Sequence, residues 1–253
     1  MEHFTIIPLR VGDYVGLEHT NFTYGHNQGK KLPCPIIAYL LRSRNMTVLV
    51  DTGPSSEEET RKNRHTPLTQ TEDQRILNAL KKHGATPETI DAVIMTHLHY
   101  DHCYGMFHFT RQPIYIQRRE WEYALNPLPC HYVVYESQLA GYFPPFLREI
   151  DKLRTVLVDG EKELVPGLTL VPLPGHTPGM QGVLVAARGG NRLIASDAVP
   201  IFENWEQYTP PLPSGLHVDL VSYYQTLERI ASYNCPILPG HDARVFELYG
   251  PDG

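Results

Sequence analysis

The stretch Thr96–His102 concentrates residue types that bind metal ions. It reads Thr-His-Leu-His-Tyr-Asp-His, so three histidines and one aspartate lie almost side by side. After thiolate, imidazole and carboxylate are the protein ligands that zinc prefers. The stretch directly follows Ala92–Met95, an apolar run with the length and β-branched content of a buried strand. The sequence therefore predicts a metal site in the loop at a strand's end, where a rigid scaffold can aim the ligands.

Three further candidate ligands also follow apolar runs that read as strands. They are His176 after Leu168–Leu173, Asp197 after Arg192–Ala195, and His241 after Pro236–Leu238. Alone, each would more often be a turn or surface residue than a metal ligand. Together with the first cluster they make seven suitable side chains at strand ends, which core packing does not explain. Seven are too many for one tetrahedral zinc ion and suit two ions that share a bridging carboxylate.

Composition sets the broad class. With 253 residues, 42% hydrophobic and 20% charged, the chain predicts a globular protein, and we expect a single domain over residues 1–253. The formal charge of -6 argues against nucleic acid as the main partner. Cysteines are scattered, the N-terminus shows no signal peptide and no apolar run could span a bilayer, so we expect a cytoplasmic protein without membrane partners. Cys103 is expected to be buried rather than a ligand.

The remaining chain alternates groups of strands with helices, which predicts two sheets packed face to face with helices outside. A polar stretch, Glu18–Pro35, is expected to be a long loop. A helix is expected to begin at Thr69 in a capping box with Glu72 and to end at Gly84. Other expected strands are Phe4–Leu9, Val11–Leu17, Ile36–Arg42, Thr47–Val50, Ile114–Ile116, Thr155–Val158 and Gly182–Ala187. Other expected helices are Arg118–Leu125 and Asp219–Tyr233, the latter with Leu220, Tyr224, Leu227 and Ala231 on one face.

The segment at about 126–150 differs in composition from its surroundings. It holds four prolines and several aromatic residues, among them Tyr132, Tyr135, Tyr142, Phe143 and Phe146. This mixture suits an irregular cap inserted over a pocket. A small satellite core under a surface excursion explains it equally well.

The complete pattern resembles the metallo-β-lactamase superfamily from Ile36 to Val245. The resemblance rests on His97-Leu-His99-Tyr-Asp101-His102, on His176 in Pro-Gly-His-Thr-Pro-Gly, and on Asp197 and His241. It implies an α+β fold, the αββα sandwich of two packed mixed sheets with outer helices. It also implies a first metal held by His97, His99 and His176, a second held by Asp101, His102 and His241, and a bridge formed by Asp197. Asp51 in Asp-Thr-Gly matches the aspartate that orients the ligands from behind.

Within that superfamily the chain looks most like N-acyl homoserine lactonases and pyridoxolactonase-type enzymes. The similarity rests on Glu18-His19, Gly29–Pro33, Ala38–Leu41, Ile116–Arg118 and Val165–Gly167. One position departs from the lactonase pattern, because Pro200 stands where those enzymes carry a tyrosine three residues beyond the bridging aspartate. Tyr208, Tyr100 and Tyr104 are the candidates to replace it.

The expected function is a metal-dependent hydrolase that opens a lactone or a similar cyclic ester or amide of a small molecule. A hydroxide bridging two divalent ions would attack the carbonyl, and Asp101 would be the catalytic residue that orients the nucleophile or carries the proton to the leaving group. Zinc is the expected metal, with manganese, iron and cobalt as alternatives. Leu98, Tyr100 and Met106 are expected to line an apolar pocket.

Four other classes compete with this interpretation. The first is an acyclic ester or thioester hydrolase of glyoxalase II type. The second is a mononuclear iron enzyme resembling persulfide dioxygenases. A nuclease is disfavoured by the acidic charge, and a purely structural zinc module by the ligand types. The protein is expected to act as a monomer or a homodimer.

Overall fold

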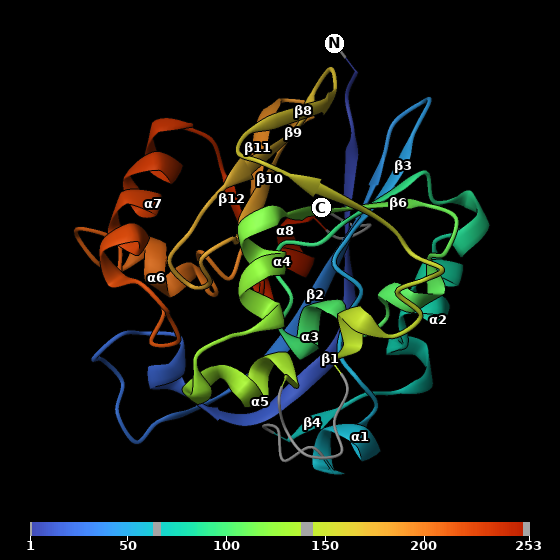
Figure 1. Cartoon of the computed structure of the whole chain (residues 1–253). Coiled ribbons are helices and arrows are strands. Elements are labelled where there is room, and N and C mark those ends of the chain that lie inside the picture. Colours follow the sequence, from blue (N-terminus) through green and yellow to red (C-terminus); the bar gives the residue numbers. More distant parts are fainter. Residues whose placement is uncertain (1, 63–66, 138–143, 250–253) are drawn as a thin grey trace.

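Two β-sheets pack face to face in the computed structural model, and helices cover their outer sides (Figure 1). The structure describes residues 2–62, 67–137 and 144–249. One sheet has seven strands in the order β4-β1-β2-β3-β5-β6-β7, and the other has five in the order β12-β11-β10-β9-β8. The expected αββα sandwich is thereby confirmed.

The seven-stranded sheet combines an antiparallel half with a parallel half. β1 pairs antiparallel with β2 and β4, and β2 with β3, whereas β3, β5, β6 and β7 run parallel. Parallel neighbours end at the same edge of a sheet, so the loops after β3 and β5 meet there. The strands are β1 (Thr5–Glu18), β2 (Lys31–Arg42), β3 (Thr47–Val50), β4 (Leu68–Thr69), β5 (Ala92–Ile94), β6 (Pro113–Gln117) and β7 (Arg154–Val158).

The five-stranded sheet supplies the other three ligand loops. Its strands are β8 (Lys162–Val165), β9 (Leu168–Pro172), β10 (Gln181–Ala187), β11 (Gly190–Ser196) and β12 (Ile237–Pro239). β11 and β12 are parallel and the other pairs antiparallel. β8 was not expected from the sequence, because an exposed edge strand with charged residues carries no apolar alternation.

The strand β2 shows how one element serves both sides of its sheet. Ile36, Ala38 and Leu40 belong to a core cluster that also holds Leu80 of helix α2 (Ile76–Lys82), while the intervening residues belong to a second cluster. That second cluster, to which Ile37, Tyr39 and Leu41 contribute, includes side chains of β9, β10 and β11. Because successive side chains of a strand point to opposite faces, a strand covered on both faces reads as a continuous apolar run.

The helices are short apart from one. α-Helices are α1 (Glu57–Lys62), α2 (Ile76–Lys82), α3 (Tyr100–Cys103), α4 (Arg118–Leu125), α5 (Tyr132–Tyr135), α6 (Phe202–Glu206), α7 (Leu220–Ser232) and α8 (Arg244–Tyr249). Single 3₁₀ turns are η1 (His19–Asn21), η2 (Glu72–Gln74), η3 (Pro87–Thr89), η4 (Met106–His108), η5 (Pro129–His131) and η6 (Pro145–Leu147). Within the described ranges, no helix combines the length and apolarity that crossing a membrane requires.

Several expected boundaries were wrong, each for a local reason. Phe4–Leu9 and Val11–Leu17 are one strand, β1, because a register shift between Arg10 and Gly12 absorbs the interruption. Thr69 lies in β4, and the capping box is formed by Thr71 with Gln74. The stretch expected as a loop, Glu18–Pro35, contains η1, and its last five residues open β2.

Helix α7 lies outside the five-stranded sheet (Figure 1) and was expected with nearly the observed bounds. The face that carries the four residues singled out in the sequence is not the buried face of the helix, however. Of these four only Leu227 is buried, and the other buried residues of α7 are Tyr223, Thr226 and Ile230. The hydroxyls of Tyr223 and Thr226 donate hydrogen bonds to backbone carbonyls. Because these polar groups are paired, the face that carries them can be buried.

Replacing Asp219 by alanine should lower the melting temperature in a pH-dependent way. Asp219 caps α7 by accepting hydrogen bonds from the backbone N–H groups of Val221 and Ser222. The Ser222 hydroxyl and these N–H groups lower the pKa of Asp219, so its contribution is complete above the ordinary carboxyl pKa of about 4 and is lost as pH falls through the folded-state pKa. Thermal melts near neutral pH and in acid should show the difference from the native protein shrinking; an equal difference at both would contradict the assignment.

In its described parts, 126–137 and 144–150, the segment from Asn126 to Ile150 contains only the short helix α5 and the single turns η5 and η6. Its expected residues Tyr142 and Phe143 lie outside the described residues. Tyr135 and Phe146 are fully buried in the same core cluster as Ala124 of α4. For these two aromatic residues the structure favours core packing over a free-standing cap.

Candidate metal centre

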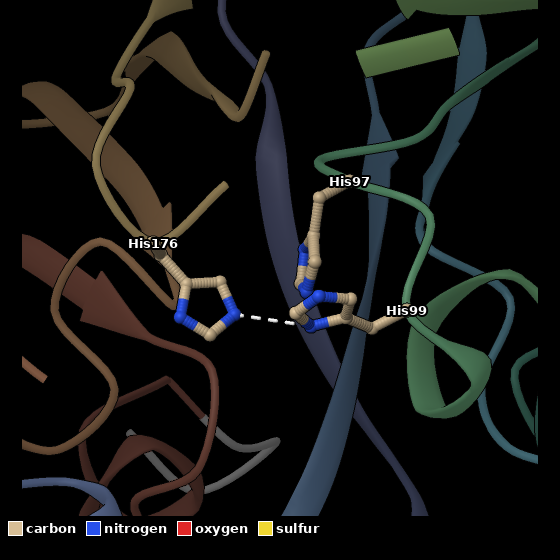
Figure 2. A group of neighbouring side chains, drawn as sticks. All are labelled: His97, His99 and His176. Atoms are coloured by element: carbon tan, nitrogen blue, oxygen red, sulfur yellow. Dashed lines mark hydrogen bonds between the residues drawn. The ribbon is translucent and has the colours of Figure 1, made fainter. Parts of the chain in front are cut away.

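The seven residues expected as metal ligands converge at one edge of the sandwich. The loop after β5 with helix α3 brings His97, His99, Asp101 and His102; the loops after β9, β11 and β12 bring His176, Asp197 and His241. All seven side chains are buried. Figure 2 shows His97, His99 and His176 turned toward one another from opposite sheets. Their ligand atoms fall into three groups with mutual separations within 4.8 Å: His97 with His99 and His176; His97 with His102 and Asp197; Asp101 with His102 and His241.

Asp197 lies between the two outer groups and faces each with a different oxygen. Its Oδ1 is 3.4 Å from Nε2 of His102 and 3.3 Å from Nε2 of His241. Its Oδ2 is 3.5 Å from Nε2 of His176. Two atoms that bind one tetrahedral zinc at about 2.0–2.1 Å lie about 3.3–3.4 Å apart. The observed separations therefore suit a carboxylate shared by two cations.

Two other pairs of candidate ligand atoms lie at similar distances. Nε2 of His176 lies 3.2 Å from Nδ1 of His99, and Nε2 of His102 lies 3.3 Å from Oδ2 of Asp101. Nε2 of His97 and Nε2 of His102 are buried without a hydrogen-bond partner. Buried polar atoms are normally paired, so these two nitrogens fit the inward-facing lone pairs of metal ligands.

Four histidines are held from behind by their outer ring nitrogens. The Nδ1 atoms of His97, His102, His176 and His241 contact Thr96 Oγ1 (3.0 Å), Asp51 Oδ2 (2.9 Å), Leu216 O (2.7 Å) and Pro35 O (2.9 Å), respectively. Where the partner is a carboxylate or carbonyl, Nδ1–H donates and Nε2 keeps its lone pair for the centre. Such outer partners fix the ring orientation of metal-binding histidines.

Asp51, which directly follows β3, is hydrogen-bonded to Thr96 in the loop after β5. Its Oδ1 accepts a hydrogen bond from the backbone N–H of Thr96 at 2.7 Å, and its Oδ2 accepts one from the Thr96 hydroxyl at 2.8 Å. Oδ2 also faces His102. Asp51 itself has a left-handed backbone with φ of 61°, a conformation that non-glycine residues adopt only where the surroundings enforce it. The contact expected for Asp51 is thus present.

The buried imidazoles and carboxylates of the centre shift one another's pKa values. Burial, together with the neighbouring imidazoles, lowers the pKa of His97 and of His99. Burial opposes protonation of His102, but the carboxylates of Asp101, Asp197 and Asp51 raise its pKa well above the ordinary value. Against its own burial, Asp197 is held at a pKa well below the usual range by His241 and His102. Two buried carboxylates therefore need positive charge here, and a cation would provide it.

Tyr14 is a residue of the centre that the sequence did not reveal. Its hydroxyl lies 2.9 Å from the hydroxyl of Tyr100, and its ring packs at 5.8 Å from that of His241. Burial and the nearby charge of Asp101 raise the pKa of Tyr14, so it keeps its proton. Nothing in the alternation of β1 distinguishes Tyr14 from a core tyrosine.

The three tyrosines considered in place of Pro200 have different surroundings. Tyr100 is buried beside Asp101 and Tyr14. The Tyr208 hydroxyl donates to Glu203 at 3.0 Å, and the Tyr104 ring lies under the guanidinium of Arg148 at 4.5 Å. Tyr100 is therefore the member of the trio that shares the environment of the candidate ligands.

The expected apolar pocket residues need a correction. Leu98 and Met106 are fully buried in the core cluster that lies behind the ligand loop, so they support the loop and do not line a pocket. Cys103 is also fully buried, and its thiol donates to the Leu98 carbonyl at 3.3 Å, which confirms that it is a buried residue.

Known proteins are similar to this chain in sequence and in fold. The family profile described as the metallo-beta-lactamase superfamily matches residues 32–241. An N-acyl homoserine lactonase of Bacillus thuringiensis is 31% identical over 250 residues, covering 92% of this chain and 94% of that one. An N-acyl homoserine lactonase of Bacillus cereus is 32% identical over 225 residues, covering 85% and 84%.

Solved structures agree with these matches. An N-acyl homoserine lactone hydrolase with N-hexanoyl-L-homoserine bound at its catalytic metal centre superimposes with a TM-score of 0.77 at 27% identity, covering 97% of this chain and 95% of that one. AidC, described as a dizinc quorum-quenching lactonase, has the same fold with a TM-score of 0.71 at 16% identity, covering 96% and 91%. With its αββα sandwich, its clustered histidines and aspartates and a profile match over most of its length, the chain belongs to the metallo-beta-lactamase superfamily.

Proposed function

We propose that this protein is a dinuclear metal-dependent lactonase that opens N-acyl homoserine lactones or closely similar cyclic esters or amides. The observation that carries the proposal is Asp197, whose two carboxylate oxygens face two separate groups of candidate ligands. Relatives named N-acyl homoserine lactonase, which match nearly the full length of this chain, support the substrate class. We further propose a single cytoplasmic domain that acts as a monomer or a homodimer.

The ligand assignment follows the two outer groups. His97, His99 and His176 would hold one cation, Asp101, His102 and His241 the other, and Asp197 both. When bound, two zinc ions would supply Lewis acidity that polarises a carbonyl and lowers the pKa of water toward about 7. Nitrogen and oxygen donors of this kind also accept manganese, iron and cobalt.

The side chains around the centre have distinct tasks in this proposal. Asp101 has a pKa below the ordinary range, because His102 and His241 outweigh its burial, so it is ionised at neutral pH and its carboxylate can orient an attacking water. Tyr14 and Tyr100 keep their protons, because burial and the nearby charge of Asp101 raise the pKa of both, and their hydroxyls share a hydrogen bond of 2.9 Å. Water adds to the lactone carbonyl, the ring C–O bond breaks, and the alcohol oxygen takes the proton.

A substrate panel tests the proposal. Zinc-loaded protein should hydrolyse N-hexanoyl homoserine lactone with kcat/KM of about 10⁴ M⁻¹s⁻¹ or more, measured by proton release with a pH indicator. An open-chain methyl ester and a thioester of the same acyl chain serve as controls and should react more slowly. Faster hydrolysis of the thioester would favour the glyoxalase II type, and dioxygen consumption by iron-loaded protein with a persulfide would favour the oxidoreductase.

A further inference from the structure

Glu120 is a fully buried carboxylate beside the candidate metal centre, and the ligand motifs do not include it. It lies in the first turn of α4. Burial raises the pKa of Glu120, and the hydrogen bonds it accepts act in the opposite direction. A buried carboxylate is costly unless several donors satisfy it, so its partners indicate what it is for.

Four donors surround this carboxylate, two at each oxygen. Oε1 accepts from the backbone N–H of Leu98 at 2.9 Å and from the hydroxyl of Tyr135 at 2.9 Å. Oε2 accepts from the hydroxyl of Thr177 at 2.5 Å and from the backbone N–H of Gly179 at 3.3 Å. The donors come from three separate segments of the chain.

Three of the four donors are next to a candidate ligand of the first group. Leu98 stands between His97 and His99 in the sequence, and Thr177 follows His176. Tyr135 packs its ring against His99, with the ring centroids 4.7 Å apart. One carboxylate thus joins the two ligand loops, which come from opposite sheets, and the ring that covers His99.

Gly179 makes this close junction feasible. A Cβ at position 179 would lie 1.9 Å from the backbone nitrogen of Glu120. Only glycine lets the loop that carries His176 lie directly on the first turn of α4. The loop and the helix therefore contact each other through their backbones as well as through the Glu120 carboxylate.

We infer that Glu120 is a positioning residue that presets His97, His99 and His176 for metal binding, and that Tyr135 ties helix α5 to that site. The inference rests on the proposed metal centre but not on the proposed substrate. It predicts a selective effect, because Glu120 contacts neighbours of the first group and not of Asp101 or His241. Outer partners of this kind typically change metal affinity by about 10–100-fold.

The substitution Glu120→Gln tests this with little change of shape. An amide has one accepting oxygen, so either the pair Leu98 and Tyr135 or the pair Thr177 and Gly179 would face an NH₂ group that cannot accept. The zinc affinity of purified, metal-stripped protein would be measured by competition with a chromophoric chelator. Glu203→Gln is the matched control, because Glu203 also accepts side-chain hydrogen bonds, from Asn27 and Tyr208, in a partly buried cluster outside the ligand groups.

Two backgrounds separate the metal sites. In a His241→Ala background, where the first group alone is complete, Glu120→Gln should weaken zinc binding about 10–100-fold. In a His176→Ala background the same substitution should leave zinc affinity unchanged, as should Glu203→Gln in both. Equal losses in both backgrounds, or a lower free energy of unfolding without any change in affinity, would overturn the inference.

Single-hydroxyl variants keep the test decisive should Glu120→Gln fold poorly. Tyr135→Phe and Thr177→Val each remove one donor and leave the carboxylate in place. Both should weaken zinc binding in the His241→Ala background, by less than Glu120→Gln, and unchanged affinity in both would refute the inference. Because the readout is zinc affinity, these outcomes are independent of the substrate panel: native protein that binds no zinc would refute the proposed function itself.

Discussion

Asp197→Asn should cost the protein one bound metal ion and reduce turnover by more than about 100-fold, beyond the loss typical of outer partners. An asparagine presents one oxygen and one NH₂ group, and the NH₂ group would face either His176 or the pair His102 and His241. The NH₂ group cannot coordinate a cation, and the neutral asparagine lacks the negative charge that would balance the cations. Metal content by elemental analysis and kcat with the lactone check the result.

The matched control for this substitution is Asp91→Asn. Asp91 accepts a hydrogen bond from the backbone N–H of Thr47 at 2.8 Å, at the opposite end of β5 from the ligand loop. This variant should keep both metal ions and most of its activity. If Asp197→Asn kept full metal content and full turnover, the shared-carboxylate assignment would be wrong.

Gly240→Ala should lower activity about 10–100-fold although it alters no candidate ligand. A Cβ at position 240 would lie 2.3 Å from Oδ1 of Asp197 and 3.2 Å from the carbonyl carbon of Ser196. The flexible carboxylate must move, and its Oδ1 is the oxygen that faces His102 and His241. The added methyl group therefore displaces the proposed bridge from one side while the fold persists.

Three measurements on Gly240→Ala separate displacement from unfolding. Zinc affinity and kcat should fall together, while the circular dichroism spectrum of the variant stays native. Gly29→Ala is the control: it strains a left-handed backbone with φ of 72° but meets no atom within 4 Å. Native zinc affinity in Gly240→Ala would show that Asp197 Oδ1 does not depend on the space at position 240.

The convergence of the seven candidate ligands could be predicted, because their residue types and their positions after strands are visible in the sequence. Each candidate ligand follows a strand, and strand ends gathered at one edge of a sandwich bring distant residues together. His176, Asp197 and His241 were identified by that position and by residue type alone. Asp51 was found through its motif, and the structure gives the physical reason in its contacts with Thr96 and His102.

The roles of Tyr14 and Glu120 could not be predicted, because nothing in the nearby sequence marks them. Tyr14 looks like any half-apolar strand residue, and Glu120 looks like an exposed helical glutamate near other charges. Their roles depend on which segments pack against them, and that is decided by tertiary contacts far along the chain. The same holds for the buried face of α7, where hydroxyl groups of Tyr223 and Thr226 find backbone partners only in the folded protein.

The number of zinc ions bound per chain is the most direct test of the central claim. Metal-free native protein would be titrated with zinc against a chromophoric chelator, and elemental analysis of the saturated, desalted protein would give the count. Two zinc ions per chain is the result that this account predicts. A protein that binds one zinc ion or none at saturation would contradict it.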